Sequence, residues 1–187
     1  MDIESIPVPA PLPPSLTTAR YEKPSPSESL VLLSWTCERL ADLSPLALYQ
    51  ALALRAEVFV VEQQCIYLDP DGVDLLAWHL LGHDGDDKLV AVARLLPPLA
   101  KGPAHRFPEI GRVLCALGAR GGGRGRALML QALLHCERLW PGQPVALSAQ
   151  AYLLNFYASL GFAPLPDTEP YLEDGILHID MRKGTAT

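Results

Sequence analysis

The sequence predicts a mixed α/β (α+β) fold, in which a central sheet is flanked by helices. Short apolar segments typical of strands alternate with two longer segments in which apolar residues recur at helical spacing. A hairpin-type turn separates two of the early strands, which predicts an antiparallel front half. With 187 residues, 49% of them hydrophobic, the chain can bury one sizeable core, so we expect a single domain, with or without a tail.

The first part of the chain is set apart by its prolines. Residues 1–30 hold seven of the eighteen prolines. Each proline removes a backbone hydrogen-bond donor and fixes φ, which excludes a helix or a central strand. We therefore predict a disordered proline-rich tail over residues 1–29 and a folded domain over residues 30–187. Binding of the tail to a partner domain as a polyproline II ligand is the alternative to a tail that only contacts solvent.

Charge and composition exclude several classes of protein. A net charge of -6 argues against a nucleic-acid-binding surface, which needs a basic face, and is compatible with a cationic substrate. No apolar run approaches the roughly 18 residues of a membrane-spanning helix, so no membrane partner is expected. The cysteines Cys37, Cys65, Cys115 and Cys136 lack any C-x-x-C pairing, which favours a reducing, cytoplasmic location. The sequence leaves a monomer and a homodimer equally open.

The elements of the front half follow from capping and turn signals. A strand is predicted over 30–37 and a loop over 63–74. Ser44 before Pro45 is typical of a helix start, because the hydroxyl caps the first turn and proline fits the first helical position. The periodicity predicts one apolar helix face made of Leu46, Tyr49, Leu52, Ala53, Ala56 and Phe59, with Gln50, Arg55 and Glu57 on the other face.

The remaining elements alternate between strands and helices. Two antiparallel strands, over 78–82 and 89–96, flank the turn sequence 83–87. Further along the chain we predict a strand over 109–117, a helix after Arg126 that ends at Pro141, a strand over 145–149, a helix over 152–160, and strands over 162–164 and 176–181. The buried stripe of the long helix is expected to be Leu128, Met129, Ala132, Leu133, Cys136, Leu139 and Trp140.

The strongest chemical feature is the run Arg120–Arg126, which joins a strand to a helix and is rich in glycine and arginine. Glycines let the backbone approach a ligand closely, and the first amides of a helix point outward without intrahelical partners. The helix start also carries partial positive charge, to which the arginines add. This arrangement predicts a pyrophosphate-binding site.

Three other interpretations of the run are disfavoured. It lacks the Gly-Lys-Ser/Thr ending of a P-loop. Its glycine spacing, with no acidic residue about twenty positions on, does not fit a Rossmann fingerprint. A disordered arginine-glycine segment that binds nucleic acid would be longer and would not lie between strongly periodic elements.

The run resembles the R-x-x-G-x-G/A signature of the GNAT acetyltransferases, which is matched by Arg120-Gly121-Gly122-Gly123-Arg124-Gly125. Residues 150–162 resemble the second block of this family, with Asn155 and Tyr157 on a short helix that ends at Gly161. Within the family the sequence is most similar to the ElaA-like acetyltransferases, over the segments 55–63, 69–74, 79–82, 110–113 and 173–179. One departure is that Cys115-Ala116-Leu117 replaces the Val-x-Pro turn of many members.

The resemblance implies a GNAT acyl-CoA N-acyltransferase fold, whose mixed sheet splays open between two strands, and it implies acetyl-CoA as co-substrate. The residues expected to bind CoA are Val113, Leu114 and Cys115 at the pantetheine arm, Arg120, Gly121, Gly122, Gly123, Arg124, Gly125 and Arg126 at the pyrophosphate, and Asn155 near the arm. Tyr157 is expected to be the general acid, because a phenol stays neutral at pH 7 and can protonate a departing thiolate.

The attacking amine also needs a proton acceptor, since an ammonium group with a pKa of about 10.4 is mostly protonated at pH 7. The candidates on loops and strand ends are Glu62, Asp71, Asp74, His79 and His178, each of which has a structural role as its alternative. His79 and His83 do not have a recognised metal spacing outside a helix, so no metal is expected.

The function expected from the resemblance is transfer of an acetyl group from acetyl-CoA to a primary amine of a small molecule or polypeptide, by direct attack in a ternary complex. The alternative is a non-catalytic module of the same shape that binds CoA or an acyl-CoA as a sensor or joins partners through its tail.

Overall fold

One twisted sheet organises the chain in the computed structural model, which describes residues 33–166 and 168–184. The predicted tail, residues 1–29, lies outside the described residues. The described strands pair in the order β1-β2-β3-β4-β5-β8-β6, and β7 pairs with β8 at one side of this path. Their bounds are β1 Ser34–Arg39, β2 Trp78–His83, β3 Leu89–Leu96, β4 Glu109–Cys115, β5 Val145–Gln150, β6 Ala163–Pro164, β7 Tyr171–Glu173 and β8 Ile176–Lys183.

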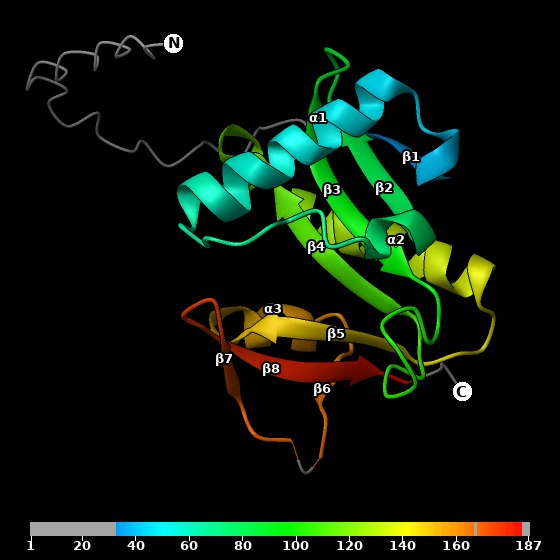
Figure 1. Cartoon of the computed structure of the whole chain (residues 1–187), viewed down its shortest axis with the longest axis vertical. Coiled ribbons are helices and arrows are strands. Elements are labelled where there is room, and N and C mark those ends of the chain that lie inside the picture. The colour runs from blue at the N-terminus through cyan, green and yellow to red at the C-terminus, as the bar shows by residue number, and fades with distance from the viewer. Residues whose placement is uncertain (1–32, 167, 185–187) are drawn as a thin grey trace, which may run out of the picture.

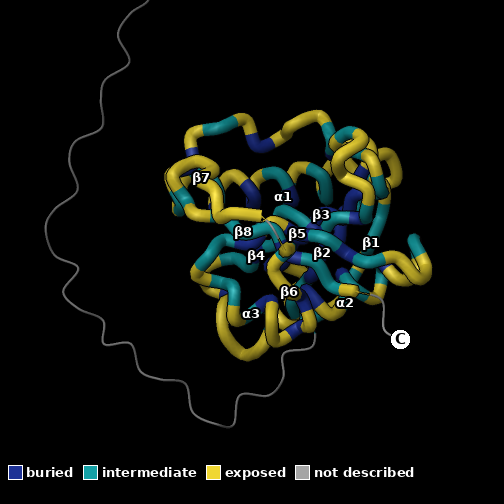
Figure 2. Tube along the Cα trace, turned by 90° about the horizontal axis from the view of Figure 1, so that it is seen from below, coloured by how far each residue is buried: buried dark blue, intermediate teal, exposed yellow. Residues whose placement is uncertain are grey.

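Helices cover both faces of the sheet (Figure 1). They are α1 Pro45–Arg55, which continues as a π-helical stretch over Ala56–Glu62, α2 Arg124–Leu139, and α3 Leu154–Ala158, which follows a 3-10 turn over Ala151–Leu153. The predicted start of α1 is confirmed, because the Ser44 hydroxyl accepts a hydrogen bond from the Ala47 amide at 3.1 Å. Burial is greatest where strands and helices face each other (Figure 2).

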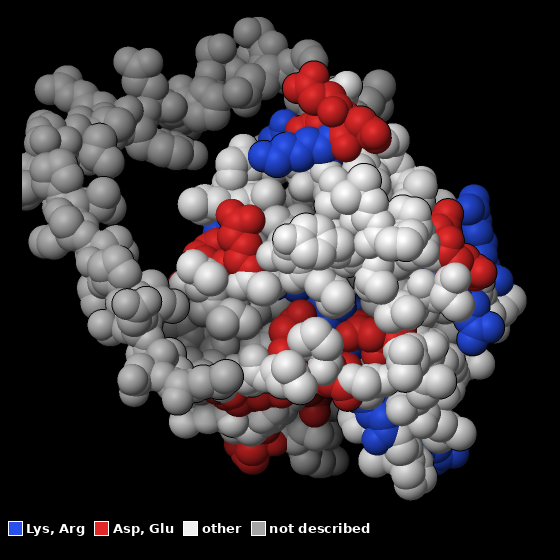
Figure 3. Space-filling model, turned by 45° about the horizontal axis from the view of Figure 1, so that its top comes forward, with Lys and Arg blue, Asp and Glu red and all other residues white. Residues whose placement is uncertain are grey.

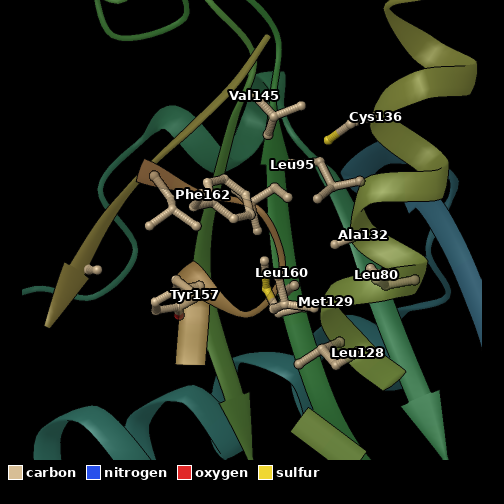
Figure 4. Packing of buried hydrophobic residues seen from close by; sticks show 14 of the residues in the cluster. Leu80, Leu95, Leu128, Met129, Ala132, Cys136, Val145, Tyr157, Leu160 and Phe162 are labelled. Atoms are coloured by element: carbon tan, nitrogen blue, oxygen red, sulfur yellow. The ribbon is translucent and has the colours of Figure 1, made fainter. Parts of the chain in front are cut away.

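The core consists of two clusters, one on each face of the sheet. On the α2 and α3 face, Leu128, Met129 and Ala132 pack against residues of β2 and β3 (Figure 4). On the α1 face, Ala51, Leu54 and Val58 pack against Leu81, Val92 and Leu114. Neighbouring residues of β2 contribute to opposite clusters because successive side chains of a strand point to opposite faces. The buried stripe predicted for α2 is confirmed at its centre.

The buried face predicted for α1 is wrong. Leu46 is 65% exposed and Tyr49 is 71% exposed, whereas Ala51 and Leu54 lie in the core. Helix α1 carries leucine or alanine on every side, so the periodicity alone does not distinguish its faces. The side that faces the sheet is the one that also carries the charged Arg55, which is only 1% exposed and ion-paired.

The predicted strand over 30–37 begins outside the described residues, and β1 covers its second half as Ser34–Arg39. The other predicted strands agree with the structure within two residues at each end, and β7 was missed. β7 is only three residues long and all three belong to the exposed class, so its sequence is too short to show the alternation of apolar and polar residues that marks a strand. β1 and β2, β2 and β3, and β3 and β4 pair antiparallel, which confirms the antiparallel front half.

The sheet splays open between β4 and β5, which are its parallel neighbours. Only Glu109 and Ala146 are paired across these two strands. Beyond that pair the strands diverge, and Figure 1 shows the gap between the sheet half that carries β1 to β4 and the half that carries β5 to β8. The mixed sheet with splayed strands that the resemblance implied is therefore confirmed.

Candidate active site

A cavity of about 1250 Å³ occupies the splay between β4 and β5. Its walls come from β4, from β5 and β8, from the end of the π-helical stretch, and from the start of α2. Pockets for single small ligands usually measure roughly 300 to 1000 Å³, so this cavity has room for more than one bound group.

One wall of the cavity is β4. Val113, Leu114 and Cys115 all line it. Because β5 leaves β4 after Glu109, the backbone N–H and C=O groups on that edge of β4 have no partner strand among the described residues. Such an edge can pair with an extended amide-containing ligand, as a further strand would.

A bulge shapes this wall. The register between β3 and β4 shifts between Val92 and Arg94, and Arg112 has a φ of 51° in the left-handed region. A bulge of this kind redirects the neighbouring backbone groups. The Arg112 side chain is held by Asp69, whose carboxylate oxygen is 2.7 Å from Nε, and its guanidinium lies over the rings of Phe59 and Tyr67.

The glycine-rich run forms the end of the cavity next to β4. Gly121, Gly122 and Gly123 have φ values of 89°, 56° and 79°, which only glycine adopts without strain. Helix α2 starts directly after them, so its first amides face outward without intrahelical partners. Arg120, Gly121 and Gly125 line the cavity, whereas the lining does not include Gly122, Gly123, Arg124, Arg126 and Asn155.

The arginines of this run have contacts within the protein. Arg124 Nη1 lies 3.4 Å from the Ala119 carbonyl, and Arg126 Nη1 lies 3.2 Å from Ser159 Oγ. Arg120 donates through Nε to the Cys115 carbonyl at 3.1 Å. Its two terminal nitrogens bind Glu62 at 2.6 and 2.7 Å, which lowers the pKa of that carboxyl below its ordinary value.

Tyr157 lies at the boundary between the core and the cavity. Its ring packs edge-on against Phe156 and Phe162, with centroids 5.0 and 6.1 Å away, and is only 6% exposed (Figure 4). The residue also lines the cavity, and no hydrogen bond of its hydroxyl is found within the described part of the chain. Burial, with a smaller contribution from Tyr152, raises the pKa of Tyr157 to about 12, so the phenol is neutral at pH 7.

The candidate proton acceptors lie in different environments. His178 lines the cavity, and its Nδ1 lies 2.9 Å from the Ile176 carbonyl. Because a carbonyl only accepts, Nδ1 carries the proton, and the neutral ring then has its lone pair on Nε2. His79 is 1% exposed, does not line the cavity and contacts the Asp74 carbonyl through Nε2. Burial lowers the pKa of His79, which keeps the ring neutral.

The other two candidates, Asp71 and Asp74, belong to a buried ion-pair network. Arg55 binds Asp69 and Asp74 at 2.8 Å each. Arg94 binds Asp71 at 2.7 Å and Asp74 at 3.1 Å. Burial would raise the pKa of Asp71, but the bonds from Arg94 outweigh it and lower the pKa to about 2. These carboxylates therefore hold the loop 63–74 against α1 and the sheet.

Three cavity residues were missed by the sequence analysis. Ser148 of β5, Tyr171 of β7 and Asp180 of β8 line the cavity together with His178. The signal that could have identified Asp180 is the alternation of β8, because residues 176, 178, 180 and 182 share one strand face. Tyr171 gave no signal, because β7 itself was missed.

Charged side chains are distributed in small groups. On the face drawn in Figure 3, basic and acidic atoms of the described residues lie next to each other in separate clusters and form no continuous basic surface.

Within residues 33–166 and 168–184 no group of His, Cys, Asp and Glu is arranged to hold a metal ion. No helix in the same residues is long and apolar enough to cross a membrane.

Known proteins resemble this chain over most of the described residues. A model of the acetyltransferase (GNAT) domain matches residues 77–185. The protein ElaA of Escherichia coli is 45% identical over 155 residues, which cover 81% of this chain and 97% of ElaA. A UPF0039 protein of Synechocystis is 44% identical over 149 residues, which cover 80% of this chain and 94% of that protein.

Solved structures show the same similarity in three dimensions. The crystal structure of an acyl-CoA N-acyltransferase from Pseudomonas aeruginosa matches with a TM-score of 0.75 and 47% identity, covering 82% of this chain and 100% of that one. The crystal structure of Escherichia coli ElaA matches with a TM-score of 0.72 and 43% identity, covering 81% of this chain and 99% of that one.

Proposed function

The chain belongs to the GNAT acetyltransferase family, and from this premise we propose that it acetylates a primary amine of a small molecule or polypeptide with acetyl-CoA. As a member of the family it is an acyltransferase whose donor is an acyl-CoA. The acetyl group, the amine acceptor and direct attack in a ternary complex are the proposed details.

The observation that carries the proposal is the open edge of β4 beside the glycine-rich start of α2, both of which line one cavity. The backbone of Val113, Leu114 and Cys115 would pair with the amide groups of the pantetheine arm. The amides of Gly121 to Arg126, in the glycine-rich turn and at the start of α2, would bind the pyrophosphate, because backbone donors and the helix dipole both favour an anion there.

The residues of the glycine-rich run would have different roles toward the donor. Arg120 lines the cavity, and its ion pair with Glu62 would have to open for its charge to act on the pyrophosphate. Arg124, Arg126 and Asn155 lie outside the lining, so we propose that they contact parts of CoA that extend beyond the cavity. Gly122 and Gly123 would serve through their backbone geometry.

The reaction requires one bond to form and one to break. The amine nitrogen attacks the thioester carbonyl carbon, a C–N bond forms, and the C–S bond breaks to leave an amide and CoA. The amine loses one proton and the sulfur gains one. Holding the amine and the thioester in one cavity can contribute up to roughly 7 to 11 kcal/mol by orientation alone.

Tyr157 would donate the proton to the departing sulfur. Its hydroxyl makes no hydrogen bond to any described residue, and its raised pKa keeps it a donor across the physiological pH range.

His178 is the better placed proton acceptor for the amine, because the lone pair of Nε2 is available in the cavity wall. Glu62 is the second candidate, but its ion pair with Arg120 makes it a weaker base. His79 lies outside the cavity, and Asp71 and Asp74 are occupied by arginines, so these three have no role in the proposed chemistry.

The function is tested by measuring thiol release from acetyl-CoA in the presence of a panel of primary amines and amine-bearing peptides. We expect turnover that depends on at least one acceptor, together with a mass increase of one acetyl group on that acceptor. Binding of acetyl-CoA without turnover for any acceptor would favour the non-catalytic alternative.

A further inference from the structure

The wall of the cavity opposite β4 carries the candidate base His178 and three further polar side chains that the proposed chemistry does not use. β5 and β8 pair antiparallel from Val145 to Gln150, which places Ser148 directly opposite Asp180. β7 pairs with β8 and brings Tyr171 opposite His178. All four of these side chains line the cavity.

Hydrogen bonds fix three of these groups relative to one another. The Tyr171 hydroxyl lies 2.6 Å from Ser148 Oγ and donates to Asp180 Oδ1 at 3.1 Å. Burial raises the pKa of Tyr171, which keeps the hydroxyl a donor. The rings of Tyr171 and His178 stack with their centroids 6.0 Å apart and an angle of 25° between the planes. The carboxylate is thus oriented by a residue whose ring also lies against the candidate base.

Asp180 is a half-buried carboxylate of the cavity without a cation, whereas Glu173 and Asp174, which line the cavity and also lack an ion pair among the described residues, are exposed. Glu62 is paired with Arg120, Asp71 with Arg94, and Glu109 with Lys101. Within the described residues Asp180 makes no ion pair, and its only side-chain hydrogen bond is the one from Tyr171. Arg182, the next residue on the same strand face, stacks on the ring of Phe107 instead.

A carboxylate in a cavity wall is stabilised when a cation completes its surroundings, because partial burial weakens its solvation. Such a site favours a group that brings both positive charge and N–H donors, since charge-assisted hydrogen bonds are the stronger kind. An ammonium group at Asp180 would lie within the same wall as Nε2 of His178, two residues away on the strand.

We propose that Asp180, oriented by Tyr171 and Ser148, binds the acceptor in its ammonium form, so that the acceptor is recognised as a cation before it loses its proton. This inference rests on the proposed function, because it assigns the acceptor side of the same cavity. Asp180 acts on binding and His178 acts on proton removal, so the two residues affect different kinetic constants.

The test measures binding of neutral and cationic ligands of similar shape to the CoA-saturated protein by calorimetry. The first pair of probes is tyramine and its alcohol analogue tyrosol. The second pair is Nα-acetyl-lysine methyl ester and Nα-acetyl-norleucine methyl ester. We expect at least one amine to bind about tenfold or more tightly than its neutral partner, as a charge-assisted hydrogen bond predicts. Equal affinity within both pairs, or no binding by either amine, would overturn the inference.

Variants test whether Asp180 causes the preference for the amine over its neutral partner. Asp180→Asn keeps the size of the side chain and is expected to remove the preference for the amine, while the affinity for CoA stays within about twofold. Tyr171→Phe releases the carboxylate and is expected to weaken amine binding severalfold. The matched control is Glu173→Gln, which removes a charge from an exposed side chain that also lines the cavity and is expected to change amine affinity less than about twofold.

The outcomes separate this inference from the proposed function. If CoA binds and amines are acetylated but the amine preference survives in both Asp180→Asn and Tyr171→Phe, only the role of Asp180 is wrong. If wild-type protein does not bind CoA, the proposed function fails. Circular dichroism of each variant checks that it is folded, and Tyr171→Phe keeps the test decisive if Asp180→Asn is unfolded.

Discussion

Tyr157 and His178, the proposed proton donor and proton acceptor, lie in environments that suit these two roles. Tyr157 has its ring in the core and its hydroxyl at the cavity, so the same burial that fixes the ring raises the pKa of the hydroxyl to about 12. His178 has its tautomer fixed by the Ile176 carbonyl. Both groups are therefore prepared for their proposed roles before substrate binds.

The first prediction concerns Tyr157. In Tyr157→Phe we expect kcat to fall by about 100-fold or more, the usual contribution of a positioned acid, with the affinity for CoA unchanged. Stability should also change little, because the hydroxyl makes no hydrogen bond within the described residues. Steady-state kinetics and calorimetry check both parts, with Tyr49→Phe on the exposed face of α1 as control. Full activity in Tyr157→Phe would rule out this donor.

The second prediction concerns His178. In His178→Gln we expect kcat to fall by about 100-fold while KM for the amine changes little, because the residue removes a proton rather than binding the acceptor. The control is His83→Gln at the end of β2, outside the cavity lining. A loss confined to KM would instead place His178 in acceptor binding.

Residue chemistry was predictable from the sequence where a linear motif carries it. The run Arg120–Arg126 and the pair Asn155 and Tyr157 could be identified before any fold was known. The partner of Arg120 could not, because Glu62 lies 58 positions away along the chain. Asp180 was missed for a similar reason, since its partners Ser148 and Tyr171 are brought to it only by the pairing of β8 with both β5 and β7.

At the level of elements, the glycine-rich turn determines where α2 begins. Three successive residues with positive φ lie directly before α2, and Gly121 and Gly125 line the cavity. Sequence analysis predicted the turn from its glycines, but placed the start of the helix after Arg126, three residues late, because arginine and glycine carry no strong helix-start signal.

The third prediction tests this turn. Gly123→Ala is expected to destabilise the protein by about 1 kcal/mol, because alanine is disfavoured at a φ of 79° although its Cβ would meet no atom within 4 Å. We also expect severalfold weaker CoA binding. The matched control is Gly118→Ala, where space is equally open and φ is not positive, so no loss is expected. Urea unfolding and calorimetry measure both quantities, and equal behaviour of the two variants would contradict the role of the turn.

For helix α1, the sequence predicted some features of the element correctly and one feature wrongly. Its existence and its cap were predicted correctly, but its buried face was not. The face is set by Arg55, whose guanidinium is bound by Asp69 and Asp74 from the loop 63–74. Periodicity treats an arginine as an exposed residue, so a buried and paired arginine is the kind of residue at which such a prediction fails.

At the scale of the whole molecule, ion pairs connect one half of the sheet to α1, whereas few contacts cross the splay between β4 and β5. Arg55, Arg94 and Arg112 connect α1, β3 and β4 through the three aspartates of one loop. Across the splay, the described strands β4 and β5 share a single residue pair, and Gln150 donates to Gln63 at 3.2 Å near the cavity. The first half of the sheet is thus tied to α1, while the gap beside it stays open.

The fourth prediction is that acid weakens the fold through this network. The bonds from arginine overcome burial and lower the pKa of Asp71 to about 2 and the pKa of Asp74 below its ordinary value. A carboxyl whose pKa is lower in the folded state binds fewer protons than in the unfolded state, so its stabilisation is present above the ordinary pKa near 4 and is lost as the pH falls toward 2. Urea unfolding between about pH 6 and pH 2 should show this decline. A free energy of unfolding that stays constant or rises over that range would contradict it.

The central claim is that the splay and the glycine-rich turn together bind the acyl-CoA donor, and hydrogen exchange tests it by position. We predict that saturating CoA slows amide exchange in two segments, 111–117, which includes the end of β4, and 121–127, which includes the glycine-rich turn and the start of α2, and leaves β1 and the outer face of α1 unchanged. Slowed exchange elsewhere with no effect on these two segments, under conditions where calorimetry shows CoA to be bound, would contradict the account.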